Sequence, residues 1–401
     1  MKKLLTGFCA ALVAVGSSNP LAIGQQSSLS KSKFPVSLVK KLQAEREKKN
    51  LLVSPYSISS ALAMTYNGAG GNTKSEMADV LGFGKALDRE VNSEYKNTVK
   101  KLTNFQNDTK LEVANALFGR KGVNFKKPFL ESNREFYGAG LETMDFASPE
   151  APVIINTWVK DKTHEKIDKI VDKVSAETIL FLINAVYFKG VWAHEFKKSD
   201  TRDEDFKLLN GQKRKVRMMH LNRKDLSYFE DDQLQAIKLF YKDKRLSLSI
   251  FLPSEKSSLA AFESKLTEEN WSKWKTQFSK REGHLALPKY RVTDKLRLNK
   301  TLSAMGMPLA FSPRRADFKA MAASSENIYI GSVLHKTFME VNEEGTEAAA
   351  VTAVVMETTT ARMPGPGGPF NMVVNRPFFF VLHDSKTDTI LFMGHVVDPK
   401  A

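Results

Sequence analysis

Residues 340–377 constrain the fold most, because their local signals favour two different structures. The stretch opens with the polar turn Asn342-Glu343-Glu344-Gly345 and ends in a Pro/Gly tract at 364–369. Between them, residues 346–356 are small or β-branched apart from one charge and a terminal methionine. A run between a glycine and a Pro/Gly tract predicts an exposed loop, whereas its valines and threonines suit a pleated strand.

The parity of this run indicates which side could be buried. In a strand, one face would carry Thr346, Ala348, Ala350, Thr352, Val354 and Met356. The other face would carry Glu347, Ala349, Val351, Ala353, Val355 and Glu357. Both charges fall on one face, as a strand with one buried side requires. The uncharged face begins with small residues, so we interpret the run as a loop that can become a strand.

The segment EEGTEAAAVTAVV at 343–355 resembles the hinge of inhibitory serpins, a family of suicide protease inhibitors. The resemblance extends to the order and spacing of the segment and to its distance from the C-terminus. An ordinary edge strand followed by a flexible loop would explain the segment taken alone. The resemblance assigns the hinge to Glu343, Glu344, Gly345, Thr346, Glu347, Ala348, Ala349 and Ala350.

Further blocks in the same order match the family from residue 34 to residue 399. They are an SPxS motif at 54–57, VYFKGVW at 186–192, LPKYRV at 287–292 and RPFFFVLHDSKTDTILFMGHVVDP at 376–399. The resemblance implies structural roles for Ser54, Ser57, Asn184, Trp192, Lys289 and His335. His335 is then expected to bond Asn184 and Ser54 under the main sheet, and Lys289 to pair with Glu343 at its top.

The expected fold class is α+β, with a single serpin domain at 30–401. The resemblance implies three β-sheets surrounded by helices and an exposed reactive-centre loop at about 343–370. The 401 residues would allow two or three domains, but no Pro/Gly/Ser linker or internal repeat divides the middle of the chain. One large domain is therefore the preferred interpretation.

Local patterns predict several elements. Amphipathic spacing predicts helices at 34–48 and 158–171, and a helix begins at Ser54 with its hydroxyl as the cap. Thr73 and Glu76 have the spacing of a capping box. Apolar runs predict strands at 111–118, 178–188 and 246–252, and a C-terminal hairpin joins 376–382 to 390–396.

Residues 1–24 resemble a secretory signal peptide, with Lys2 and Lys3 before an apolar core at 4–15. Cys9, the only cysteine, lies inside this segment, so the mature chain has no thiol or disulfide. A lipoprotein anchor at Cys9 is a weaker alternative. These features predict a secreted protein, extracellular or periplasmic, and the MKKLL start suggests a bacterial source.

The formal net charge of +15 fits a solvated, lysine-rich surface better than a nucleic-acid or membrane partner. Lys96 and Lys100 would share a helix face, where some serpins bind glycosaminoglycan, but nearby acids disfavour that role. His164-Glu165 lacks the second histidine of a metalloprotease motif, so we expect no metal. No cofactor is expected, and the family resemblance implies a monomer.

The resemblance implies a secreted suicide inhibitor of serine proteases, with cysteine proteases as a second class. The protease attacks the loop, forms an acyl-enzyme, and is trapped when the cut loop inserts into the main sheet. The chain is then not an enzyme, and its partner is a target protease held in a covalent complex. A non-inhibitory serpin acting as carrier, chaperone or storage protein is the alternative. A secreted hydrolase is a third, but no catalytic motif surrounds the seven histidines.

The scissile bond remains open between two positions. The usual family spacing after the hinge glycine places it between Thr359 and Thr360, which suits proteases with small pockets. The rival is Arg362-Met363, which suits a trypsin-like pocket that pairs a carboxylate with the guanidinium. The Pro/Gly tract makes the segment after Thr359 longer than is common, and we favour Thr359 slightly.

Overall fold

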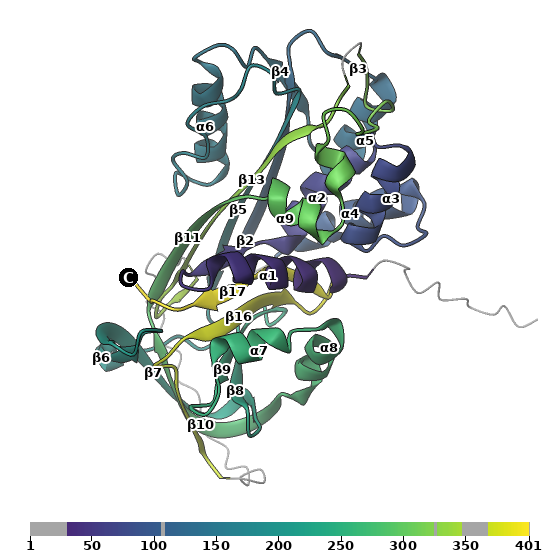
Figure 1. Cartoon of the computed structure of the whole chain (residues 1–401). Helices are drawn as coiled ribbons and strands as arrows, with labels where there is room; N and C mark the ends of the chain where they lie inside the picture. Colours follow the sequence, from purple (N-terminus) through teal and green to yellow (C-terminus); the bar gives the residue numbers. More distant parts are fainter. Residues whose placement is uncertain (1–29, 106–108, 325–326, 347–367, 401) are drawn as a thin grey trace, which may run out of the picture.

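The structure is a computed structural model that describes residues 30–105, 109–324, 327–346 and 368–400 (Figure 1). Within these residues the chain forms a six-stranded, a nine-stranded and a two-stranded sheet. In Figure 1, most of the N-terminal helices gather on one side of the six-stranded sheet, and α6 lies on the other. The predicted α+β class, with one domain built from three sheets and surrounding helices, is confirmed for the described residues.

The helices of the described chain are mostly short and lie around the sheets. They are α1 Lys33–Arg46, α2 Pro55–Tyr66, α3 Gly71–Leu81, α4 Asp88–Leu102, α5 Lys127–Tyr137, α6 Ala151–Lys162, α7 Leu259–Ser264, α8 Glu268–Gln277 and α9 Asn299–Met305. Two 3-10 turns, η1 Lys198–Asp200 and η2 Pro308–Phe311, complete the helical elements.

The six-stranded sheet holds the longest central strands. Its order is β11 Tyr290–Arg297, β13 Ile330–Val341, β14 Gly345–Thr346, β5 Leu180–Val191, β2 Lys110–Arg120 and β4 Leu141–Met144. β14 lies between β13 and β5 at only one end of the sheet. Over the rest of their paired length, β13 and β5 pair directly with each other in parallel. The sheet is therefore split at one end and closed over the rest of its length.

The nine-stranded sheet carries the C-terminal hairpin. Its order is β1 Leu51–Val53, β17 Thr389–Val396, β16 Phe378–Asp384, β9 Leu246–Pro253, β8 Leu234–Phe240, β7 Lys213–Glu230, β10 Ser279–Pro288 and β15 Phe370–Val373, with β6 Arg202–Lys207 on β7. The two-stranded sheet pairs β3 Asn124–Phe125 with β12 Ala322–Ala323.

Strand β5 separates two hydrophobic cores, which explains its nearly continuous apolar sequence. Leu180 and Leu182 belong to the large core that also contains α2. Phe181 and Ile183 belong to a smaller core with Ile155 of α6. Because successive side chains of a strand point to opposite faces, a strand covered on both faces must be apolar at every position.

Some local predictions are wrong because other hydrogen bonds replace the expected ones. The helix expected at 158–171 ends at Lys162, and the chain then turns through His164 at a φ of 48°. Thr73 and Glu76 form no capping box: the Thr73 hydroxyl accepts from the Asp317 amide, and Glu76 accepts from the Leu309 amide. Both side chains thus fasten α3 to the segment before β13.

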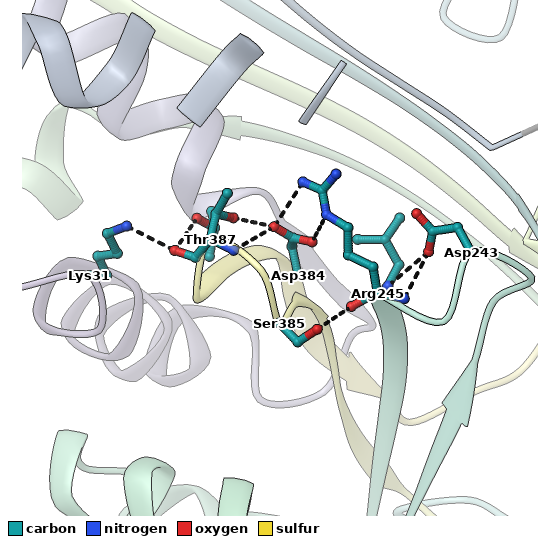
Figure 2. Close-up of polar contacts among 8 residues, drawn as sticks. Lys31, Asp243, Arg245, Asp384, Ser385 and Thr387 are labelled. Atoms are coloured by element: carbon teal, nitrogen blue, oxygen red, sulfur yellow. Dashed lines mark hydrogen bonds and ion pairs between the residues drawn. The ribbon is translucent and has the colours of Figure 1, made fainter. Parts of the chain in front are cut away.

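A buried ion pair links two turns of the nine-stranded sheet (Figure 2). Arg245, before β9, donates from Nε and from a terminal nitrogen to the two oxygens of Asp384, at 2.5 and 3.1 Å. The Asp384 carboxylate also accepts from the amide and hydroxyl of Thr387. Ser385 donates its hydroxyl to the Arg245 carbonyl at 2.9 Å. The pair therefore fixes the C-terminal hairpin to the β8–β9 turn.

We expect Asp384→Ala to lower the free energy of unfolding by about 3–5 kcal/mol, because it leaves the Arg245 guanidinium buried without its carboxylate. Urea unfolding followed by circular dichroism measures this loss. Arg202→Gln removes an exposed ion pair with Glu204 and should change stability by less than about 1 kcal/mol. Equal losses in the two variants would contradict this account.

Candidate functional site

The hinge enters the six-stranded sheet at its split end. Gly345 lies opposite Val191 of β5, and Thr346 lies between Gly190 of β5 and Val341 of β13. The short strand runs antiparallel to both neighbours. The first residues of the predicted loop-to-strand segment thus already occupy strand positions.

Gly345 is required by a close approach of two backbones. A Cβ atom built on this residue would lie 2.0 Å from the carbonyl oxygen of Gly190. Gly190 is constrained in turn, because a Cβ there would lie 2.6 Å from the ring of Tyr241. Any side chain at Gly345 would therefore push the hinge out of the sheet.

Thr346 points inward, on the face that the sequence parity predicts to be buried. Its side chain is fully buried, and its Oγ1 lies 2.6 Å from the hydroxyl of Tyr241. Tyr241 stacks on Trp192, with ring centroids 4.5 Å apart. Burial raises the pKa of Tyr241 well above 10, so this hydroxyl stays protonated and uncharged beside the hinge at any ordinary pH.

Trp192 holds the turn before the hinge through two nitrogens. Its indole Nε1 donates to the Asn342 carbonyl at 3.0 Å, and its backbone amide donates to the Glu344 carbonyl at 2.9 Å. The Asn342 side chain in turn accepts from the amides of Glu344 and Gly345. Trp192 therefore sets where the turn begins.

Glu343 is a buried carboxylate with two partners. Lys289 lies 2.9 Å from Oε2, and the Thr201 hydroxyl donates to Oε1 at 3.0 Å. Burial favours a higher pKa for Glu343, but these hydrogen bonds outweigh it and hold the pKa below the ordinary 4.5. Glu343 is therefore ionised at neutral pH and anchors the turn to β10–β11.

A second polar cluster crosses the closed part of the sheet. The Nδ1 atom of His335 on β13 lies 2.6 Å from the Asn184 side-chain oxygen on β5. The amide of Ser54 donates to His335 Nε2 at 3.0 Å. Asn184 donates its own amide to the Ser57 hydroxyl on α2. These four residues are buried, so the cluster ties the two central strands to the start of α2.

The hydrogen bonds assign the protonation of His335. Because Nε2 accepts from the Ser54 amide, the proton lies on Nδ1 and is donated to Asn184. Burial lowers the pKa of His335 to about 3. The imidazole is therefore neutral and structural, and Ser54 contributes its backbone, since its hydroxyl makes no cap bond.

Sequence reasoning missed three members of these clusters. Asn115 on β2 accepts from the Asn184 amide, Tyr241 meets Thr346, and Thr201 donates to Glu343. Asn115 could have been found, because it is a polar residue inside a predicted strand, and such a residue needs a partner. Tyr241 follows β8 directly and Thr201 follows η1, and no local pattern fixes where either position lies in the fold.

Several predicted site residues lie outside the described residues. They are the hinge residues Glu347, Ala348, Ala349 and Ala350 and the candidate scissile residues Thr359, Thr360, Arg362 and Met363. In the part of the chain that the structure describes, no group of three or more His, Cys, Asp or Glu could hold a metal ion. No helix among those residues is long and apolar enough to cross a membrane.

Comparison with known proteins identifies what the chain resembles. A family profile described as "Serpin (serine protease inhibitor)" matches residues 29–399. Serpin B10 of Papio anubis is 34% identical over 395 residues, which cover 92% of this chain and 98% of the relative. Serpin B8 of Homo sapiens is 36% identical over 373 residues, covering 91% and 97%.

Solved structures agree with this assignment. Tengpin, a thermophilic serpin in the native state, superposes with a TM-score of 0.83 at 32% identity, over 92% of this chain and 93% of the other. Thyroxine-binding globulin in complex with thyroxine superposes with a TM-score of 0.83 at 26% identity, covering 94% and 99%.

These relatives correct the predicted localisation. Serpin B10, Serpin B8 and a Serpin B6 of Macaca fascicularis belong to an intracellular group, which contradicts a secreted, extracellular or periplasmic protein. Residues 1–24, whose hydrophobic pattern suggested secretion, lie outside the described residues. The suggested bacterial source is likewise not supported by these mammalian relatives.

The buried neutral His335 predicts a loss of stability in acid. Between its unfolded pKa near 6.5 and its folded pKa of about 3, the unfolded chain binds a proton that the folded chain does not. The free energy of unfolding should therefore fall by up to about 1.4 kcal/mol per pH unit as pH drops through this window.

His335→Gln removes this linked proton. We expect the variant to be less stable than the parent near neutral pH, yet to lose less stability between about pH 6.5 and about pH 4.5. Urea unfolding at a series of pH values measures both slopes. His164→Gln, at an exposed histidine beside Glu112, is the matched control for the loss of an imidazole that is not buried. Parallel curves for the parent and His335→Gln would rule the linkage out.

Proposed function

This chain belongs to the serpin family, and we propose that it is a suicide inhibitor of serine proteases that works by inserting its cleaved loop into the six-stranded sheet. The observation that supports this proposal is the place of Gly345 and Thr346 between β5 and β13. Insertion has a starting point there, because the two central strands are already separated at that end.

The register of the hinge defines a path for the rest of the loop. Thr346 pairs antiparallel with Val341 and Gly190. If this pairing continued along both strands, Thr352 would lie between His335 of β13 and Asn184 of β5. The same register places Glu357 opposite Ile330, the first residue of β13. The inward face of the inserted strand would then be the uncharged one, and both glutamates would face outward.

Insertion exchanges one set of strand contacts for another. The bond between His335 and Asn184 would break, and the parallel pairing of β13 and β5 would be replaced by two antiparallel ladders. Each added residue brings new backbone hydrogen bonds, and the small inward side chains need little rearrangement. The added backbone pairing favours insertion. The buried bond between His335 and Asn184 must first break, so it slows insertion.

The chemistry of trapping takes place on the target protease. Its serine attacks the carbonyl of the scissile residue, forms an ester with that residue, and releases the chain that follows as a new amino terminus. Insertion must be completed before water hydrolyses the ester. In this mechanism the serpin supplies only the bond that is cut, so we propose that it is an inhibitor and not an enzyme.

The register favours Thr359 as the scissile residue. The β13 strand accommodates the loop up to Glu357, and Thr359 follows two residues later. A cut after Arg362 would leave three more residues between the sheet and the bound protease. We therefore propose Thr359–Thr360 as the bond, with Arg362–Met363 as the rival.

A carrier function is the second candidate, because thyroxine-binding globulin superposes on nearly the whole chain. A carrier needs no loop insertion, whereas this chain has small residues on the inward hinge face. Stabilisation on cleavage discriminates the two: an inserting serpin becomes more resistant to heat once its loop is cut.

Thr346→Arg should convert the inhibitor into a substrate. Thr346 is already buried between β5 and β13, so an unpaired guanidinium there would cost several kcal/mol, force the hinge out of the sheet and remove the starting point of insertion. Glu347→Arg is the matched control, since the same side chain on the outward face remains in solvent. Incubation with pancreatic elastase and gel analysis under denaturing conditions would score covalent complex against cleaved protein. Undiminished complex formation by Thr346→Arg would remove the insertion mechanism.

Incubation of the parent with trypsin and, separately, elastase should yield a complex that survives boiling and a released C-terminal peptide. We expect the peptide to begin at Thr360, and N-terminal sequencing identifies it. A peptide that begins at Met363 would assign the site to Arg362. Cleavage by several proteases without any complex would favour a non-inhibitory serpin.

A further inference from the structure

A cavity of about 480 Å³ lies beside the segment that holds the hinge, between β7, β8 and the start of β10. Its apolar lining includes Leu221, Leu226, Leu239, Phe240 and Phe278. Sites for small organic ligands commonly have such a volume and an apolar wall with a few polar groups. The fold alone gives no role to this space.

Three lysines line the cavity, and none of them forms a close ion pair with a carboxylate among the described residues. They are Lys238, Lys244 and Lys280. Among the described residues, no carboxylate oxygen lies within 4.0 Å of any of these ammonium groups. Asp225, the carboxylate in the lining, pairs with Arg223 at 2.9 Å. The cavity therefore presents an excess of positive charge.

Lys238 is the most informative of the three. It is half-buried on β8, and its Nζ lies 4.3 Å from the centre of the Phe278 ring. Burial, together with repulsion from Lys275, lowers the pKa of Lys238. Because the Lys238 ammonium group lies over an aromatic ring and is partly removed from water, it has lost part of its hydration. An anion placed beside it would therefore bind favourably.

We propose that this cavity is a binding site for a small organic anion with an apolar body, such as an aromatic sulfonate or carboxylate. The anionic group would pair with Lys238, and the apolar body would lie against Leu226 and Phe278. This inference goes beyond protease inhibition and does not depend on it, because binding is measured on the isolated protein.

The cavity also touches the residues that hold the hinge. Trp192 and Ala193 form part of its wall, and the Ala193 amide donates to the Phe240 carbonyl at 2.8 Å. The Trp192 indole donates to Asn342 on its other side. A ligand in the cavity would therefore change the surroundings of Trp192, which gives a spectroscopic signal of occupancy.

Isothermal titration calorimetry of the full-length protein with naphthalene-2-sulfonate tests the proposal. We expect saturable binding, accompanied by a change in tryptophan fluorescence that Trp192→Phe abolishes. The uncharged 2-naphthol should bind at least about tenfold more weakly, because it forms no ion pair with Lys238. Equal affinity for the two probes would overturn the proposed role of the lysines.

Lys238→Met keeps the length of the side chain and removes its charge. We expect it to weaken sulfonate binding by about tenfold or more and to leave 2-naphthol binding unchanged. Lys336→Gln is the matched control, since it removes another half-buried lysine charge, on β13 and away from the cavity. It should retain the parent affinity.

Ser227→Phe is an independent test that fills the cavity from β7 without changing a charge. Loss of sulfonate binding in this variant, with its unfolding transition intact, supports the site. Parent-like affinity in both Lys238→Met and Ser227→Phe would place the bound anion elsewhere on the protein and would refute the proposal.

Discussion

The pairing of β5 with β13 is the interaction on which the rest of the structure depends. These two strands lie at the centre of the six-stranded sheet, and helices cover both of its faces. Their pairing is closed by the bond between Asn184 and His335, and it is open only where Gly345 and Thr346 lie between them. The same seam, the junction of β5 and β13, thus stabilises the fold as it stands and is where the proposed insertion would begin.

One polar cluster lies at each end of this seam, and the two clusters hold their segments through different interactions. At the open end, an ionised Glu343 held by Lys289 fixes the turn that leads into the hinge. At the closed end, the neutral His335 accepts from the Ser54 amide and donates to the Asn184 side chain, without any charge. A charge at the surface end can be solvated when the turn moves, whereas a charge at the centre would be expensive to bury.

Much of this arrangement can be predicted from the sequence, and the remainder depends on contacts that no local pattern encodes. The apolar run around Asn184 and the parity at Thr346 follow from strand periodicity, so the central strand and the buried hinge face are predictable. The capping box at Thr73 fails because a distant segment bonds the Thr73 hydroxyl. The helix ends at Lys162, and side chains bond the amides that follow: Thr163 accepts from Ile167, and Asn156 accepts from Ile170 and Val171. Tyr241 belongs to the site only through long-range packing, so its role could not be read from neighbouring residues.

The strands on either side of residues 347–367 belong to different sheets. Thr346 is held in the six-stranded sheet, and β15, which begins at Phe370, pairs in parallel with β10 in the nine-stranded one. While the chain is intact, the intervening segment is tethered at both ends, and further entry into the seam would pull on β15. In the proposed mechanism, cutting one peptide bond would separate the hinge from β15, and because that bond is not re-formed, each molecule could undergo insertion only once.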